Sequence, residues 1–256
     1  MNSFALYPSL KNKGVLITGG ATGIGAAFVE HFCAQHSRVI FIDQNAKAAE
    51  QLIQTIKQTG HVVPTFYSCD LRDNAALKKI IIEVNQTIGV IQILINNAGN
   101  DQRYPVADIT PELWNDILQV NLNHYFFAAQ TVQPFMAQAG SGSIINISSN
   151  CYLLGQEPNY PGYMTAKAAI MGLTRALGCA FGPHHIRVNC ILPGWVMTEQ
   201  QIKKWLTPEA EIELMKTQAL KQKIYPADIA RMALFLAADD SALCTKQTFI
   251  VDGGRV

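Results

Sequence analysis

The stretch GVLITGGATGIG, residues 14–25, decides the fold that this sequence predicts. Its first five residues are apolar or β-branched and indicate a buried strand. The glycine-rich turn that follows, Thr18-Gly19-Gly20-Ala21-Thr22-Gly23-Ile24-Gly25, opens a segment of helical character. Glycines let a backbone turn sharply and approach a pyrophosphate, which the amides and positive dipole of a helix N-terminus then bind. Between a buried strand and a helix, this turn predicts a dinucleotide-binding α/β fold.

The alternation of strand and helix continues along the chain. Runs expected as strands occupy residues 14–18, 38–42, 62–68, 91–95, 143–147, 186–191 and 248–251. Segments of helical period lie at 23–36, 45–59, 73–87, 110–138, 163–181 and 226–238. Most of the strands are apolar throughout, as in parallel sheets that are covered on both faces. Residues 1–256 are therefore predicted to form a single doubly wound Rossmann domain, an α/β fold with a seven-stranded parallel sheet.

Residues 194–223 interrupt this rhythm with a largely helical excursion after the sixth strand. Ligands bind at the carboxyl ends of the strands in such folds, and the excursion starts there. We therefore expect a small helical lid over the site, with an ordinary surface insertion as the alternative.

Composition excludes several classes of protein. Hydrophobic residues make up 49% of the chain, charged residues 15%, and the net charge is +1, so we expect no nucleic-acid partner. No apolar run approaches the roughly 20 residues of a membrane span, and the N-terminus lacks the pattern of a secretory signal. The six cysteines form no CxxC pair and no cluster with histidine that predicts a metal site. These features favour a cytoplasmic protein without a metal.

Asp43 ends the second predicted strand, eighteen residues after Gly25. A carboxylate at this position can accept both hydroxyls of the adenosine ribose and would repel a 2′-phosphate. The nearest following cation is Lys47, one helical turn further on. The sequence thus predicts NAD rather than NADP as cofactor. A role for Asp43 as a helix N-cap is the alternative, and it is compatible with the first.

Tyr163 and Lys167 form a YxxxK motif near the start of a predicted helix. Residues at i and i+4 share a helix face, so the two side chains are expected one turn apart. A phenol titrates near ~10 in water and is a poor base at neutral pH. A nearby ammonium and the positive nicotinamide ring of NAD both favour the phenolate. The pair therefore predicts general acid–base catalysis.

The spacing TGxxxGxG, combined with YxxxK, resembles the short-chain dehydrogenase/reductase family from about residue 10 to the VDGG at 251–254. The resemblance implies that Asp70 holds the adenine, although by its residue type alone it could equally cap the next helix. It also matches NNAG (96–99) and PGxxxT (193–198) to cofactor motifs. The cofactor-binding residues it implies are Gly19, Thr22, Gly23, Ile24, Gly25, Asp43, Asp70, Leu71, Asn97, Ala98, Gly99, Tyr163, Lys167, Pro193, Gly194, Val196 and Thr198.

The resemblance also implies two further catalytic residues. Asn121 matches the family's asparagine that bends a helix and holds a water relaying protons to the lysine; from its residue type alone it could be a capping or solvent-facing residue. Family members place a serine thirteen residues before the tyrosine, but here that position holds Asn150. Alignment from the strand end selects Ser149, with one extra residue in Gln156–Gly162. We choose Ser149, with Ser148 second and a role for Asn150 left open.

Four stretches resemble the aldose 1-dehydrogenases of this family, which oxidise sugars such as xylose at the anomeric carbon: YPSLKNK (7–13), NNAGNDQR (96–103), WLTPEAE (205–211) and LFLAADDSALCT (234–245). The resemblance implies oxidation of an aldose to its lactone by a homotetramer. A reductase of 3-oxoacyl thioesters or other carbonyls, and a non-catalytic NAD-binding scaffold, are the alternatives. Trp195 either stacks on the sugar ring or packs in the core. The expected substrate-binding residues are Ser149, Tyr163, Asn100, Arg103 and Trp195, with Asp101, Gln102, Asn123, His124, Gln156 and Asn159 as further polar candidates.

Overall fold

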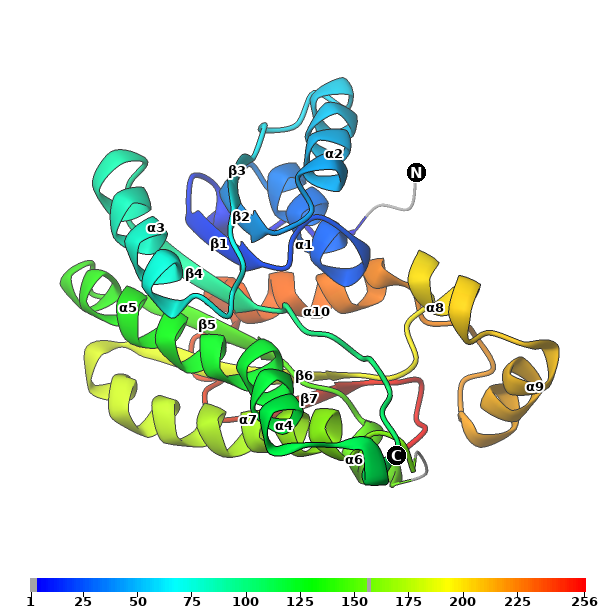
Figure 1. Ribbon diagram of the computed structural model, residues 1–256. Coiled ribbons are helices and arrows are strands. Elements are labelled where there is room, and N and C mark those ends of the chain that lie inside the picture. The colour runs from blue at the N-terminus through cyan, green and yellow to red at the C-terminus, as the bar shows by residue number, and fades with distance from the viewer. Residues whose placement is uncertain (1–3, 156–157) are drawn as a thin grey trace.

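One parallel sheet forms the centre of the computed structural model, which describes residues 4–155 and 158–256 (Figure 1). The strands run across it in the order β3-β2-β1-β4-β5-β6-β7, and every neighbouring pair is parallel. This arrangement confirms the predicted single doubly wound α/β fold. The strands are β1 (Gly14–Thr18), β2 (Arg38–Asp43), β3 (Thr65–Ser68), β4 (Ile91–Asn96), β5 (Gly142–Ile147), β6 (Ile186–Pro193) and β7 (Thr248–Val251).

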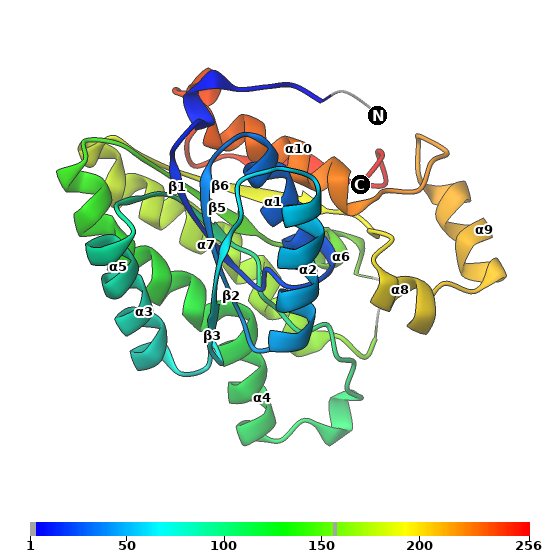
Figure 2. The ribbon, with the colours of Figure 1, turned by 90° about the horizontal axis from the view of Figure 1, so that it is seen from above.

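Helices cover both faces of the sheet (Figures 1 and 2). One face packs against α1 (Gly23–Ala34), α2 (Ala46–Gln58) and α10 (Pro226–Ala237), and the other against α3 (Asn74–Thr87), α5 (His124–Gln138) and α7 (Pro161–Phe181). Successive side chains of a strand point to opposite faces. In β1, Val15 and Ile17 therefore join one apolar cluster and Leu16 joins the other, and all three are fully buried. A strand buried on both faces explains the continuous apolar runs.

The structure corrects two predicted elements. The third strand begins at Thr65 and not at residue 62, because Pro64 has no N–H for the ladder. The single helix expected over 110–138 is α4 (Pro111–Leu118) followed by α5, joined by a π-helical turn at Gln119–Asn123. This turn contains Asn121 and lies beside the site.

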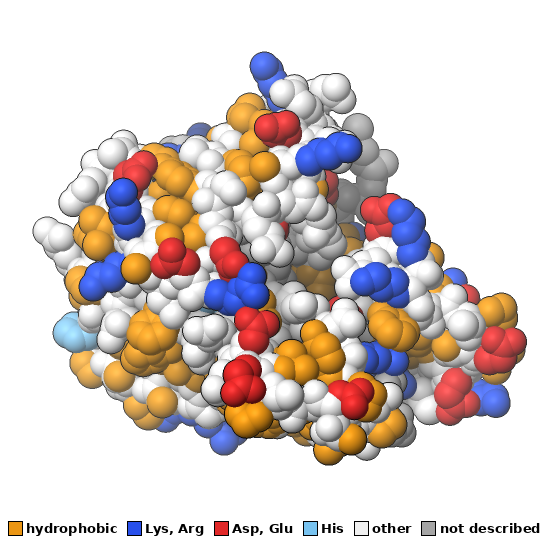
Figure 3. Space-filling model, in the orientation of Figure 1, with side chains coloured by type: hydrophobic (Ala, Val, Ile, Leu, Met, Phe, Trp, Pro, Cys, Tyr) orange, Lys and Arg blue, Asp and Glu red, His pale blue; other side chains and the backbone are white. Residues whose placement is uncertain are grey.

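The excursion after β6 carries two helices, α8 (Glu199–Lys204) and α9 (Pro208–Thr217), as its composition predicted. They project beyond the carboxyl ends of the strands in both ribbon views (Figures 1 and 2). The space-filling view shows a surface hollowed between these helices and the body, with acidic and basic side chains interspersed (Figure 3). The remaining helical turns are α6 (Cys151–Leu154) and the 3₁₀ turns Pro8–Leu10, Val106–Asp108, Gly182–His184 and Asp239–Ser241. Among the described residues, no helix combines the length and apolar character needed to cross a bilayer.

Candidate active site

The glycine-rich turn forms a tight cradle between β1 and α1. Gly19 and Gly23 have φ angles of 66° and 57°, a region that side chains other than glycine rarely adopt. A Cβ on Gly25 would lie 1.8 Å from the carbonyl oxygen of Gly19. Thr22 makes no side-chain capping bond to α1, so side chains leave the first amides of this helix open to an anion. The cradle therefore fits the pyrophosphate of a dinucleotide, while Ile24 packs against the core.

Asp43 is bound to the cradle from the end of β2. Its Oδ2 accepts a hydrogen bond from the amide of Ala21 (3.0 Å), and its Oδ1 accepts one from the amide of Asn45 (2.9 Å). The N-cap of α2 is Asn45, whose side chain accepts from Ala48 N (3.1 Å). Asp43 is thus not the helix cap, and its carboxylate stands beside the glycine turn, where the ribose hydroxyls were predicted.

Asp70 forms an ion pair with Arg72, at 2.6 Å between Oδ2 and Nη2. The hydrogen bonds from Arg72 hold the pKa of this exposed carboxyl below its usual value. Asp73, and not Asp70, caps α3, because its side chain accepts from Ala76 N (2.9 Å). The side chain of Leu71 is buried in the core, so only its backbone can face a cofactor.

The Asn96–Gly99 segment ties three strands together. Asn96 Nδ2 donates to Asn146 Oδ1 (2.9 Å), which joins β4 to β5. Asn97 Nδ2 donates to the carbonyl oxygens of Thr18 (3.1 Å) and Gly19 (3.0 Å), which joins β4 to the cradle. A Cβ on Gly19 would lie 2.7 Å from the Cα of Ala98, so the two backbones touch. Much of the motif is structural, and Gly99 is exposed at its end.

The segment from Pro193 to Thr198 reaches back to the glycine turn. Gly194 donates from its amide to Val251 O (3.0 Å), and the buried Val196 forms a bridge with Ile224. Thr198 caps α8 by accepting from Gln201 N (3.3 Å). A Cβ on Gly23 would lie 3.2 Å from Thr198 Cγ2. The fold thus brings motifs that lie about 175 residues apart in the sequence, near Gly23 and Thr198, into one site.

Tyr163 and Lys167 lie on one face of α7, as the i, i+4 spacing predicts. The Lys167 ammonium is 5.5 Å from the centroid of the Tyr163 ring. Its Nζ donates to Ile147 O (3.0 Å) and to Tyr125 Oη (3.1 Å). Burial lowers the pKa of Lys167 to about 8, and burial also raises the pKa of Tyr163 well above its usual value. Without the positive charge of a bound cofactor, the chain therefore holds Tyr163 as a neutral phenol.

The three residues at the end of β5 have different partners. Ser148 Oγ donates to the carbonyl of Lys167 (2.6 Å), and Asn150 Nδ2 donates to Asp252 Oδ2 (3.1 Å); both side chains are buried. Ser149 is only partly buried, and its Oγ accepts from Cys151 N (3.2 Å), which leaves its O–H able to donate. The geometry favours Ser149 over its two neighbours. Gln156, in the loop assigned the extra residue, lies outside the described residues.

Asn121 is buried within the π-helical turn and is neither a cap nor a solvent-facing residue. Its Oδ1 accepts from Asn100 N (2.9 Å), and its Nδ2 donates to Ile117 O (3.0 Å). The side chain thereby fastens the loop after β4 to the bent helix. A Cβ on Gly99 would lie 2.9 Å from Asn121 Oδ1 and 3.3 Å from Lys167 Nζ, so both side chains lie against Gly99.

A family model described as "Enoyl-(Acyl carrier protein) reductase" matches residues 19–255. The chain belongs to the short-chain dehydrogenase/reductase family. It is 44% identical to the "Probable galactose dehydrogenase GalD" of Rhizobium meliloti (strain 1021), over 97% of this chain and 96% of that protein. It is 43% identical to the D-xylose 1-dehydrogenase of Caulobacter vibrioides, over 98% and 99%. The protein is therefore an oxidoreductase of the short-chain dehydrogenase type.

Solved structures of this family share the fold across nearly the whole chain. A 3-oxoacyl-[acyl-carrier protein] reductase from Brucella melitensis with bound NAD is 29% identical, with a TM-score of 0.87 and coverage of 99% and 97%. A candidate NAD(P)-dependent gluconate 5-dehydrogenase from Beutenbergia cavernae with bound NADP is 27% identical, with a TM-score of 0.90 and coverage of 97% and 98%. Both nicotinamide dinucleotides thus occur in the family, and the chain has the cradle for one of them.

The loop after β4 contacts helix α8 on the open side of the short-chain dehydrogenase site. The Asp101 carboxylate accepts hydrogen bonds from Gln200 Nε2 (2.9 Å) and from Gln201 Nε2. Trp195, which is partly buried, donates its indole N–H to Gln201 Oε1 (2.8 Å). We name Asp101, Gln200 and Gln201 the amide clasp, because they join helix α8 to the loop after β4.

Arg103 makes a second link, between the end of α8 and the start of α7. Its guanidinium lies 4.0 Å from the ring centroid of Trp205 and 5.1 Å from that of Tyr160. The Tyr160 ring is 4.9 Å from the ring of Tyr163. Arg103, expected as a substrate residue, thus connects Trp205, after α8, to the neighbourhood of Tyr163, the predicted catalytic tyrosine. Tyr160, Trp205 and Tyr125 were not predicted; Tyr160 stands three residues before Tyr163, a helical spacing that could have marked it.

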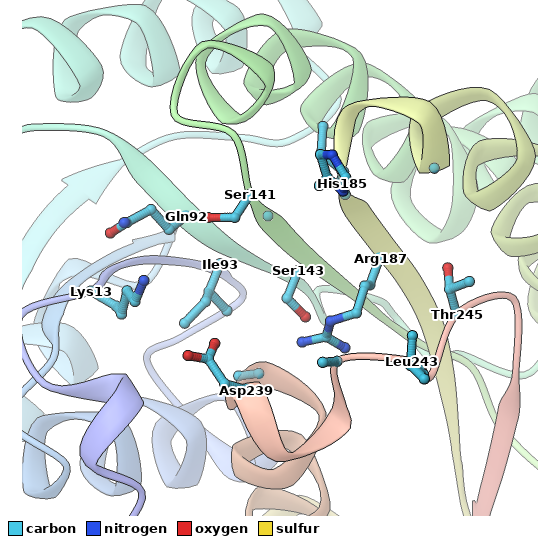
Figure 4. Close-up of a pocket in the computed structure, with 15 residues that line it drawn as sticks. Lys13, Gln92, Ile93, Ser141, Ser143, His185, Arg187, Asp239, Leu243 and Thr245 are labelled. Atoms are coloured by element: carbon cyan, nitrogen blue, oxygen red, sulfur yellow. The ribbon is translucent and has the colours of Figure 1, made fainter.

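A cavity of about 400 Å³ lies at the opposite end of the sheet (Figure 4). Its lining includes Lys13, Gln92, Ser143 and Arg187, which lie at or before the amino ends of the strands. Arg187 Nη2 donates to Leu236 O (2.7 Å), so its guanidinium serves the packing of α10. The cavity contains no predicted site residue, and ligands of doubly wound folds bind at the other edge.

Proposed function

We propose that the protein is an NAD-dependent aldose 1-dehydrogenase that oxidises a sugar at its anomeric carbon to the lactone. The observation that carries this proposal is the 43–44% identity, over nearly the whole chain, to two proteins named as sugar dehydrogenases. The polar side chains of the amide clasp and Arg103, which lie near Tyr160 and Trp205, support it, because a hydroxylated ring needs many hydrogen-bonding partners. The related 3-oxoacyl reductase from Brucella melitensis is more distant, at 29% identity.

The proposed roles follow from the positions of four side chains. Tyr163, as phenolate, takes the proton of the anomeric hydroxyl. Ser149 donates a hydrogen bond to the reacting oxygen, since its O–H is available. The Lys167 ammonium stabilises the phenolate, and Asn121, close to Lys167, anchors a water that relays the proton outward. NAD, when bound, supplies the hydride acceptor for this oxidation.

The preference for NAD is part of the proposal and is supported by Asp43. Its carboxylate stands beside the glycine turn and carries the negative charge that a 2′-phosphate would meet. The backbone of the glycine cradle would hold the pyrophosphate, and the segment from Pro193 to Thr198 would hold the nicotinamide. Comparison of kcat/KM with NAD and with NADP tests this preference; equal or greater efficiency with NADP would contradict it.

Residues 194–223 are proposed as a lid that closes over the sugar. Asn100 and Arg103 from the loop after β4, and Trp195 at the base of the lid, are the proposed substrate contacts. Trp195 is only partly buried, which supports a place at the site over one in the core. The lid meets the loop through the amide clasp, so both sides of the substrate space are polar.

A homotetramer and a cytoplasmic location complete the proposal. Phe126 and Phe127 on α5 are 39% and 36% exposed, which supports an interface on this helix. All six cysteines are free thiols, as is usual in a reducing compartment. Light scattering of the purified protein would test the tetramer directly, and a monomeric mass would contradict it.

The proposed activity is tested with purified protein, NAD and a panel of aldoses, followed by NADH absorbance. We expect turnover with at least one aldose and none with the corresponding alditol, which lacks an anomeric carbon. Absence of turnover with every aldose, together with reduction of an acetoacetyl thioester, would favour the reductase alternative. Bound NAD without any turnover, unchanged by Tyr163→Phe, would favour the scaffold.

A further inference from the structure

Tyr125 is a buried tyrosine next to the catalytic lysine that the predicted motifs do not include. It is the second residue of α5 and has no exposed surface. Its hydroxyl donates to the carbonyl of Ile147 (2.8 Å) and lies 3.1 Å from Lys167 Nζ. A hydroxyl that donates its one hydrogen to a carbonyl keeps its lone pairs for a second partner. Tyr125 therefore accepts a hydrogen bond from the Lys167 ammonium.

Two acceptors fix the ammonium on its inner side. Lys167 Nζ donates to Tyr125 Oη (3.1 Å) and to Ile147 O (3.0 Å), and Tyr125 itself binds the same carbonyl. An ammonium has three N–H donors, so one remains for the side that faces Tyr163. The Nζ atom lies 5.5 Å from the Tyr163 ring centroid on that side.

We propose that Tyr125 is a positioning residue for proton transfer, whose neutral phenol keeps the Lys167 ammonium charged and directed toward Tyr163. The proposal rests on the proposed roles of Tyr163 and Lys167 but not on the identity of the sugar. It adds a hydrogen-bond acceptor on α5 to the four catalytic side chains already named.

The groups around Lys167 show why its charged form needs a hydrogen-bond acceptor. The titratable groups facing it are His124 and Tyr125 on α5, Cys151 on α6, Tyr163 on α7, Cys190 on β6 and Asp101 after β4. Burial lowers the pKa of His124 to about 3, so this imidazole is neutral at the working pH. Burial raises the pKa of Tyr125 well above its usual value, so its hydroxyl also stays neutral. Lys167 is thus the positive charge of this cluster, and burial opposes it.

These contacts determine the direction in which the pKa of Lys167 changes when the Tyr125 hydroxyl is removed. A hydrogen bond to the ammonium favours the charged form, so loss of the Tyr125 hydroxyl lowers the pKa of Lys167 further. The lysine of the variant then loses its proton at a lower pH than that of the wild type. Because the ammonium supports the Tyr163 phenolate, oxidation declines from that pH upward.

The test is Tyr125→Phe, which keeps the ring packed against Ile170, Cys190 and Leu192 but removes the hydroxyl. We expect the alkaline limb of the kcat–pH profile to move to a lower pH by about one unit. This is the shift expected when an ammonium loses one hydrogen bond. We expect KM for the substrate to change less than about twofold, because no substrate contact is removed.

Thr174→Val is the matched control. Thr174 is a buried hydroxyl in the same layer that binds Asn146 Nδ2 (3.0 Å) and not Lys167. It should lower Tm without moving the pH profile. If Tyr125→Phe lowers kcat by the same factor at every pH, or leaves the alkaline limb in place, Tyr125 is only a structural residue. In a Lys167→Met background, Tyr125→Phe should have no further effect on kcat.

A second readout separates this proposal from the proposed function. NADH affinity is measured by nicotinamide fluorescence from about pH 6 to 10. The pH at which this affinity starts to weaken should be lower for Tyr125→Phe than for the wild type, because Lys167 is one of the proposed cofactor-binding residues and its charge would be lost at a lower pH. An unchanged pH dependence would overturn the role of Tyr125. This measurement needs no sugar, so failure of every aldose would refute the proposed function and leave the role of Tyr125 to be decided by binding.

Discussion

The cofactor side and the proposed substrate side of the site are built from different kinds of contact. On the cofactor side, backbone touches backbone: a Cβ on Gly25 would lie 1.8 Å from Gly19 O. On the substrate side, partly exposed side chains meet across loops, as in the amide clasp between Asp101 and α8. The close backbone approach permits only glycine at position 25, whereas several kinds of polar residue could form the hydrogen bonds of the amide clasp. The sequence therefore specifies the candidate dinucleotide side far more tightly than the proposed substrate side.

The largest effect is expected where the two sides meet, at Tyr163. Tyr163→Phe keeps the ring beside Tyr160 and removes the proton acceptor, so kcat should fall about 10²–10⁴-fold. Steady-state NADH formation measures this loss. Tyr67→Phe is the control, since that exposed hydroxyl contacts only Glu83 in the described structure. Turnover by Tyr163→Phe within tenfold of wild type would contradict the catalytic role.

The second prediction compares Ser149 with Ser148. Ser149→Ala removes the donor to the reacting oxygen and should lower kcat about 10²–10³-fold. Ser148→Ala removes the 2.6 Å hydrogen bond to the carbonyl of Lys167, which lies inside α7, and should cost about 0.5–1.5 kcal/mol of stability. Kinetics and thermal unfolding of both variants decide between them. A larger kcat loss in Ser148→Ala would assign the catalytic role to Ser148.

The third prediction concerns the charge of Asp43. Asp43→Asn keeps an oxygen that can accept from Ala21 N but removes the negative charge. The ratio of kcat/KM for NAD over NADP should fall about tenfold, because the repulsion of a 2′-phosphate is lost. Asp70→Asn is the matched change at an aspartate paired with Arg72, and it should affect both cofactors alike. An unchanged ratio in Asp43→Asn would show that another group sets the preference.

The smallest effect is expected at the amide clasp. Asp101→Asn weakens the hydrogen bonds from Gln200 and Gln201 to the loop, so KM for the sugar should rise about two- to fivefold at unchanged kcat. Glu199→Gln on the same helix removes an exposed pair with Lys203 and serves as control. Equal KM changes in the two variants would mean that general loosening of α8, and not the clasp, controls closure.

The fold was predictable, and the candidate cofactor side could be named from the sequence, because both depend on local rules of backbone geometry. The apolar strands, the glycine turn and the YxxxK spacing each follow from backbone geometry or helical period. The partners of Ser148 and Asn150 were not predictable, since Lys167 and Asp252 reach them only through the fold. Tyr125 escaped prediction for the same reason: nothing in HYFF distinguishes a core tyrosine from one that binds a catalytic lysine. The break in the helix over 110–138 left no mark in composition.

The π-helical turn at Gln119–Asn123 fixes how far α5 is rotated about the helix axis relative to α4. An α-helix advances about 100° per residue, so one additional residue in a turn rotates everything before it relative to everything after it. Here Ile117, before the turn, packs on Gly162 of α7, and Tyr125, after it, faces Lys167 on the same helix. Deletion of one residue from the turn would restore a regular helix, and one of these two contacts would then be lost. The length of this segment is therefore as constrained as its sequence.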